Sequence, residues 1–197
     1  MSNPNAPNGF QYFGRLEGGA PTAGLSTRLV SSADTTALGY GDPVTSLGTG
    51  YVTASAAGTT QIDGIFYGCQ FYSTVIGRTV NQNYYPGSGA GGDVIAYICT
   101  DPDAMFLVHA VNTAIAFADI GANINFVAGT PNSVTQMSTA SIDQSTIATT
   151  NTLPFRIVGL YSQEAPPGAS GADDTSAYNI CIVSPNLWDR KSLTGIV

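Results

Sequence analysis

The sequence has 197 residues, the length of one ordinary domain, and combines a net charge of −7 with only 10% charged residues, against roughly 25% in typical soluble proteins. Lysine and glutamate normally cover helix surfaces, and here they are reduced to Lys191, Glu17 and Glu164. Threonine, serine and asparagine supply 51 residues instead. This composition excludes a mainly helical protein and predicts an all-β fold.

The acidic balance also limits the partners of the chain. Nucleic-acid binding relies on clustered lysine and arginine, and this chain has only six cationic residues. The opening segment 1–10 has neither the basic nor the apolar region of a secretion signal. No run reaches the roughly 18 apolar residues of a membrane-spanning helix. We therefore expect no nucleic acid and no membrane among the partners.

Residues 1–22 are predicted to form an extended N-terminal arm ahead of a β domain over 23–197. The arm is rich in proline and glycine but too aromatic for a solvated tail. Aromatic anchors on such an arm favour docking on another protein subunit, with an arginine available for an acidic partner. The expected docking residues are Phe10, Tyr12, Phe13, Arg15 and Leu16. The alternative is that the arm folds back on its own domain.

The β domain is predicted from short runs of apolar, aromatic and β-branched residues separated by turn formers. These runs are Leu25–Val30, Val44–Leu47, Tyr51–Ala54, Ile62–Ser73, Thr79–Tyr85, Val94–Cys99, Met105–Ala110, Asn123–Val127, Phe155–Tyr161 and Tyr178–Val183. Ala114–Ile120 is the best helix candidate, of one or two turns. No internal repeat of 20 to 50 residues occurs, which argues against a propeller or solenoid.

Ile62–Ser73 is long and aromatic, which predicts a central strand. Gly64 and Gly68 lie four apart in it, where a strand bends, bulges or meets another backbone closely. Val94–Cys99 and Met105–Ala110 flank an Asp-Pro-Asp turn. They predict a hairpin in the middle of the sheet.

Two segments carry too little apolar content for strands. Residues 130–152 read as a long polar insertion, suited to contacts between copies of the protein, and 163–177 read as a loop. Together with the strand-like runs, they predict a single β domain with an extended N-terminal arm and one long polar insertion.

Residues that might carry chemistry have simpler explanations. Gly87–Gly92 matches the dinucleotide-binding pattern G-x-G-x-x-G, but a strand follows it where that site requires a helix. The single histidine, His109, has few partners for a metal site and is interpreted as a core or interface residue. We therefore expect no catalytic residue, no bound metal and no cofactor.

The acidic pairs and the cysteines are interpreted in the same way. Asp101 with Asp103, and Asp173 with Asp174, lie in turns, where aspartate bonds to local backbone. The cysteines at 69, 99 and 181 are scattered singly in apolar surroundings. This pattern is typical of buried free thiols, and a disulfide between the first two is the alternative.

Several stretches together resemble one known family, in the same order from Asn5 to Val183. They are NAPNGF (Asn5–Phe10), GDPV (Gly41–Val44), IDGIFYG (Ile62–Gly68), YYP (Tyr84–Pro86), DVIAY (Asp93–Tyr97), DP (Asp101–Pro102), ADIGAN (Ala118–Asn123) and LPFRIVGL (Leu153–Leu160). The family consists of tailed-bacteriophage head proteins encoded near the major capsid protein, which are regarded as capsid decoration or cement proteins.

The resemblance implies an all-β subunit, a single antiparallel β-barrel or jelly-roll-like sandwich with an extended N-terminal arm. It also implies a structural virion protein on the capsid exterior, made in the cytoplasm of the bacterial host. Its partners would be the major capsid protein and further copies of itself, as a dimer or trimer at capsid symmetry axes. The family implies no catalytic residues, so we expect no enzyme. Two other classes stay open: a virion surface β module that binds a host receptor or glycan, and a small β-fold hydrolase that cleaves polysaccharide. The hydrolase would need two carboxylates facing each other in a groove.

Overall fold

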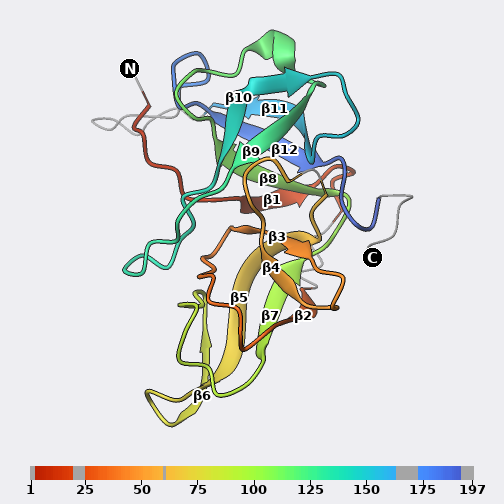
Figure 1. The fold of residues 1–197 in the computed structure, drawn as a ribbon. Coiled ribbons are helices and arrows are strands. Elements are labelled where there is room, and N and C mark those ends of the chain that lie inside the picture. Colours follow the sequence, from red (N-terminus) through yellow and green to blue (C-terminus); the bar gives the residue numbers. More distant parts are fainter. Residues whose placement is uncertain (1–2, 20–24, 60, 163–172, 192–197) are drawn as a thin grey trace.

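The computed structural model describes residues 3–19, 25–59, 61–162 and 173–191. Within them the chain forms two antiparallel sheets of six strands each, packed as a sandwich (Figure 1). Sheet A has the strand order β1 (Gln11–Arg15), β8 (Ala104–His109), β12 (Ile180–Pro185), β11 (Phe155–Tyr161), β9 (Asn123–Val127) and β10 (Ser141–Ala148). Sheet B has the order β2 (Ser26–Val30), β7 (Val94–Cys99), β5 (Gly64–Ser73), β3 (Pro43–Ser46) and β4 (Val52–Ala54), and β6 (Arg78–Gln82) pairs with β5.

The all-β prediction is confirmed, and of its two architectures the sandwich is correct. The barrel alternative is wrong, because neither sheet closes on itself in the described chain. Where a short helix was predicted near residue 117, the structure has one 3-10 turn, η1 (Phe117–Asp119). No described helix has the length and apolar character needed to cross a membrane.

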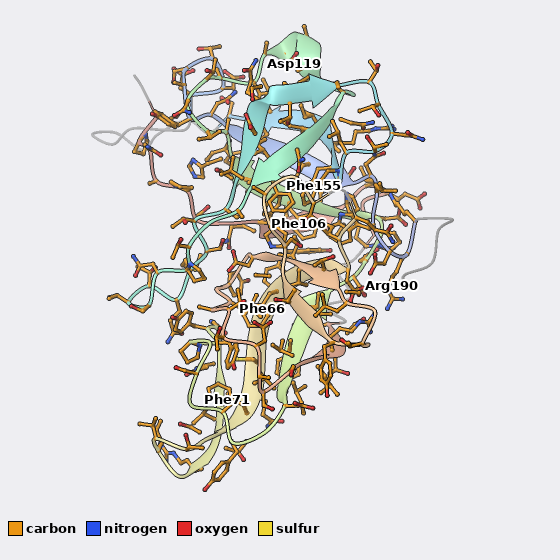
Figure 2. All side chains as sticks on the ribbon, viewed as in Figure 1. Phe66, Phe71, Phe106, Asp119, Phe155 and Arg190 are labelled. Carbon is orange, nitrogen blue, oxygen red and sulfur yellow. The ribbon has the colours of Figure 1, made fainter. Side chains whose placement is uncertain are left out.

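The core has two parts, which meet along β5. The larger part lies between the inner face of sheet A and one face of β5, to which Ile65 and Tyr67 belong. The smaller part lies on the other side of β5, around Phe66 and Phe71. Figure 2 shows Phe106 and Phe155 in the body of sheet A and Phe66 and Phe71 along sheet B. Strand β5 therefore joins the two halves, as its long apolar sequence predicts.

Glycines give β5 its shape. The pairing of β5 with β7 shifts register between Phe66 and Gly68, which is a β-bulge. At Gly64, a Cβ atom would lie 2.3 Å from the carbonyl oxygen of Cys99 on β7. The two backbones can approach this closely only because the residue is glycine. The place of β5 in the middle of sheet B and its bulge confirm the prediction of a central, irregular strand.

The predicted hairpin between Val94–Cys99 and Met105–Ala110 is wrong. Strand β7 pairs with β2 and β5 in sheet B, whereas β8 pairs with β1 and β12 in sheet A. The intervening turn therefore carries the chain from one sheet to the other. Two adjacent apolar runs are compatible with either arrangement, because both sheets need strands buried in the shared core.

The polar insertion at 130–152 is also not a single excursion. Its second half contains β10, an edge strand of sheet A, with Ile142 fully buried. An edge strand with a mostly polar sequence presents only a few residues to the core, which explains the weak apolar signal. The segment 130–140 remains outside the sheets. Of the predicted loop 163–177, residues 163–172 lie outside the described residues.

Candidate protein-docking site

The predicted N-terminal arm is not free, because residues 11–15 form β1 and pair with β8 at the edge of sheet A. Phe10 is fully buried and stacks on Phe155, with 4.5 Å between ring centroids. Its backbone N–H donates to the carbonyl oxygen of Gly41 over 3.0 Å. The alternative in which the segment folds back is therefore the correct one. The expectation that Phe10 faces a partner is wrong, because the core of this subunit already encloses it.

Tyr12 and Arg15 are also occupied within the subunit. The Tyr12 ring meets the Phe106 ring edge to face, with 6.2 Å between centroids, and burial raises the pKa of its hydroxyl. The Arg15 guanidinium lies 2.8 Å from the Asp101 carboxylate and 3.6 Å from that of Asp103. The acidic partner expected for Arg15 is thus the turn between β7 and β8, not another protein.

Phe13 and Leu16 are exposed, with 45% and 43% of their surface accessible. The pairing of β1 with β8 shifts register between Tyr12 and Gly14, so Phe13 is an extra residue in the ladder. Its ring meets the Tyr161 ring on β11 edge to face, with 6.1 Å between centroids. Of the five predicted docking residues, these two remain available on the surface.

Phe13 adjoins a row of apolar residues on the face of sheet A that points away from the core. Alternation along β8 buries Phe106 and Val108 and leaves Met105 and Leu107 half-buried. Alternation along β12 likewise leaves Ile180 and Ile182 half-buried. We call the resulting surface the outer apolar face; it consists of Phe13, Met105, Leu107, Tyr161, Ile180 and Ile182.

The strand register places these residues side by side. Leu107 pairs with Ile182 on β12, and Met105 pairs with Gly14 on β1. Gly159 on β11 pairs with Ile182. Two positions next to the apolar side chains therefore carry no side chain of their own. The outer positions also include polar residues, since Gln11 on β1 pairs with Leu107 and His109 on β8 pairs with Ile180. An antiparallel sheet that faces water normally alternates apolar and polar residues, so the apolar side chains at these outer positions are a candidate contact surface.

Four residues of this face, Met105, Leu107, Ile180 and Ile182, are not among the docking residues expected from the sequence. Their signal was present, because β8 and β12 each read as a continuous apolar run where one solvated face predicts alternation. The run in β8 was instead interpreted as one strand of a hairpin in the middle of the sheet, which gives it no solvent-facing side.

A groove of about 440 Å³ lies at one end of the outer apolar face. It runs beside the paired residues Arg156 on β11 and Ser184 on β12. Leu16, Ile120, Val158 and Pro185 supply its apolar lining, and Arg156 and Lys191 supply two cations.

The glycine-rich segment 87–92 packs against the turn between β5 and β6. The backbone N–H of Thr74 donates to the carbonyl of Gly89 over 2.8 Å, and that of Gly91 donates to the carbonyl of Tyr72 over 2.9 Å. Strand β7 follows the segment, so the expectation that a strand and not a helix comes after the motif is confirmed. The glycines permit close contact between backbones.

The remaining polar candidates are placed within the fold. His109 is half-buried on β8, and burial lowers its pKa. The Asp101 carboxylate accepts the backbone N–H of Asp103 over 3.0 Å, and the Asp173 carboxylate accepts that of Thr175 over 2.8 Å, which confirms the turn interpretation. Within the described residues, no three His, Cys, Asp or Glu side chains cluster as metal ligands would.

The three cysteines are free and buried, as predicted. Burial raises the pKa of both Cys69 and Cys181 to about 12. Because the thiolate is the reactive form, these thiols are chemically quiet in the folded protein.

In comparisons with known proteins, no protein-family model, no curated protein and no solved structure matches the chain.

Proposed function

We propose that this chain is a structural virion protein that decorates the outer surface of a phage capsid and cements neighbouring major capsid protein subunits. The observation that carries the proposal is the outer apolar face, where the exposed Phe13 lies beside the half-buried side chains of Met105, Leu107, Ile180 and Ile182, because apolar patches on a protein surface mark interaction sites. The resemblance of stretches along the sequence to phage decoration proteins supports the nature of the partner. The function is binding, and no reaction step is part of it.

The docking residues proposed here differ from those expected from the sequence. Phe13 stays in the set, and Met105, Leu107, Ile180 and Ile182 join it. Burying an apolar side chain fully stabilises an interface by about 1.5 to 3 kcal/mol. Since these side chains are already half-buried, each contributes roughly 1 kcal/mol on docking. Several such residues on each copy, multiplied over many linked copies, would hold the protein firmly on a shell.

Copies of the protein would contact each other on the shell as a dimer or trimer. The segment 130–140, which projects away from the sheets in Figure 1, is suited to this contact because Val134 is 89% exposed. We expect the substitution Val134→Ser to shift the oligomer towards the monomer in sedimentation velocity, and an unchanged sedimentation coefficient would contradict this contact.

The docking proposal is tested by co-sedimentation with purified heads that lack the protein. The double substitution Phe13→Ser and Leu107→Ser should weaken binding at least tenfold, because it removes two of the apolar contacts. The matched control is Leu29→Ser, since Leu29 lies on β2 in sheet B and is also 45% exposed. The control should bind like the wild type.

Two outcomes would overturn the proposal. One is that the wild-type protein does not sediment with heads at all, and binding to a glycan array would then favour the receptor-binding alternative. The other is that the control loses as much affinity as the double variant. For cementing, decorated heads should release their DNA at a higher temperature than bare heads, with EDTA present in both samples.

A further inference from the structure

The groove beside the outer apolar face has an unusual charge for this protein. The chain has a net charge of −7 and six cationic residues. Two of the six, Arg156 and Lys191, line this one groove, and among the lining residues that the structure describes there is no carboxylate. The nearest acidic residues along the chain, Glu17, Asp119 and Asp189, lie outside the lining. The groove is therefore a local cationic site on an acidic protein.

Both cations are tethered but not neutralised. The Nε atom of Arg156 donates to the Asn123 side-chain oxygen over 3.1 Å, which leaves the two terminal nitrogens of the guanidinium for a ligand. The Nζ atom of Lys191 donates to the carbonyl of Pro185 over 3.0 Å, which leaves two of its three protons. Neither side chain forms an ion pair with a described carboxylate, whereas Arg15 and Arg28 both do.

These tethers matter because fixed donors lose less entropy on binding than free side chains do. A guanidinium with two free nitrogens matches a carboxylate in bidentate geometry, and the ammonium beside it adds a second donor. The apolar lining from Leu16, Ile120 and Val158 would accept an aliphatic side chain next to the carboxylate. The ligand that fits both parts is a peptide with alternating acidic and apolar residues.

We propose that the groove receives an acidic, aliphatic-containing peptide segment of the partner protein. This inference rests on the proposed function, because the groove adjoins the face through which docking is proposed. The outer apolar face supplies contact area. The two cations of the groove bind the acidic segment and so fix the orientation of the partner on that face.

The test uses two fluorescently labelled octapeptides and no capsid. One has the sequence GLDELEDG, and its twin GLNQLQNG replaces each carboxylate by an amide. By fluorescence anisotropy at low salt, the acidic peptide should bind at least tenfold more tightly than its twin. The preference should fall as salt is raised, because screening weakens charge pairs near the surface. Inorganic phosphate, the third probe, should compete only weakly, because it cannot use the apolar lining.

The variants isolate the cations. The substitutions Arg156→Gln and Lys191→Gln together should abolish the preference for the acidic peptide. The matched control is Arg78→Gln, because Arg78 is an exposed arginine on β6 in sheet B, away from the groove. Circular dichroism checks that each variant is folded. The single substitution Lys191→Gln removes one cation and keeps the hydrogen bond between Arg156 and Asn123.

The inference is overturned if both peptides bind equally, if the control loses the preference as well, or if phosphate competes as effectively as the acidic peptide. These results are distinct from failure of the proposed function. Heads that bind the protein while the peptides are not discriminated would refute only the groove assignment. Peptides that are discriminated while heads are not bound would refute the capsid partner and leave an acidic-peptide site.

Discussion

The substitution Phe10→Ala provides the sharpest test of how the first segment is used. Phe10 is fully buried, stacks on Phe155 and meets Phe106 and Phe126 edge to face, at 6.4 and 6.5 Å between centroids. Truncating a buried phenylalanine costs about 3 to 5 kcal/mol of unfolding free energy. In a domain of this size each kcal/mol shifts the midpoint by about 2 to 4 °C. We therefore expect the melting temperature to fall by roughly 10 °C.

The matched control lies three residues further on. Phe13→Ala removes the same side chain from an exposed position, so its cost should stay within about 1 kcal/mol. Urea unfolding followed by fluorescence suits both variants, because the single tryptophan, Trp188, is fully buried and stacks on Phe106 at 5.8 Å. The reasoning is refuted if Phe10→Ala unfolds with the wild type or if Phe13→Ala is the more damaging change. By the same reasoning, deletion of residues 1–16 is expected to prevent folding, since it removes Phe10 and β1 together.

Two further predictions concern buried groups. Asp42 is 4% exposed, and burial raises its pKa to about 6, so the folded state holds a proton that the unfolded state has released. The stability of the wild type relative to Asp42→Asn should therefore fall by roughly 2 kcal/mol between pH 4 and pH 6.5. Urea titrations of both proteins at several pH values measure this difference in unfolding free energy. His109, whose pKa is lowered by burial, has the opposite effect of pH on stability, but it is present in both proteins and cancels in the difference. A difference that does not change with pH would contradict a raised pKa at Asp42. Gly87→Ala should lower the melting temperature by several degrees, because Gly87 has φ +73° and an added Cβ would lie 2.2 Å from the Thr35 carbonyl oxygen. Gly92→Ala is its control, with no atom within 4 Å of the added Cβ, and equal melting of the two variants would disprove the packing argument.

The sequence was sufficient to predict ten of the twelve strands in the described residues, because apolar and β-branched residues cluster between turn formers, but it did not predict β1 or the mostly polar β10. It could not predict which sheet each strand joins. Strand β8 follows β7 after a short turn, yet its partners are β1 and β12, and local sequence contains no signal for such distant pairing. The same limit applies to Arg15, whose partner Asp101 lies 86 residues away.

The candidate site was predicted in part, and the reason lies in one irregularity of β1. Three aromatic residues, Phe10, Tyr12 and Phe13, occur within four positions, so simple alternation would place Phe10 and Tyr12 on one face and Phe13 on the other. That alternation is present, but no composition argument indicates which face belongs to the core. The register shift at Tyr12 and Gly14 and the burial of Phe10 decide it. Phe13 was therefore expected on a free arm, whereas it lies exposed at a bulge of β1 within sheet A.

The pairing of β1 with β8 also has a consequence for the order of events during synthesis. Every strand of sheet B lies between residues 26 and 99, so that sheet can assemble once this part of the chain has left the ribosome. Strand β1 is made first but must wait for β8, and β8 in turn borders β12, which ends at residue 185. Contacts between such distant segments form slowly, because the chain loses the entropy of closing a long loop before these contacts can stabilise it. Until then the buried aromatic side chains of sheet A, Phe10 among them, have no complete core to enter, and exposed apolar surface makes such intermediates prone to aggregate.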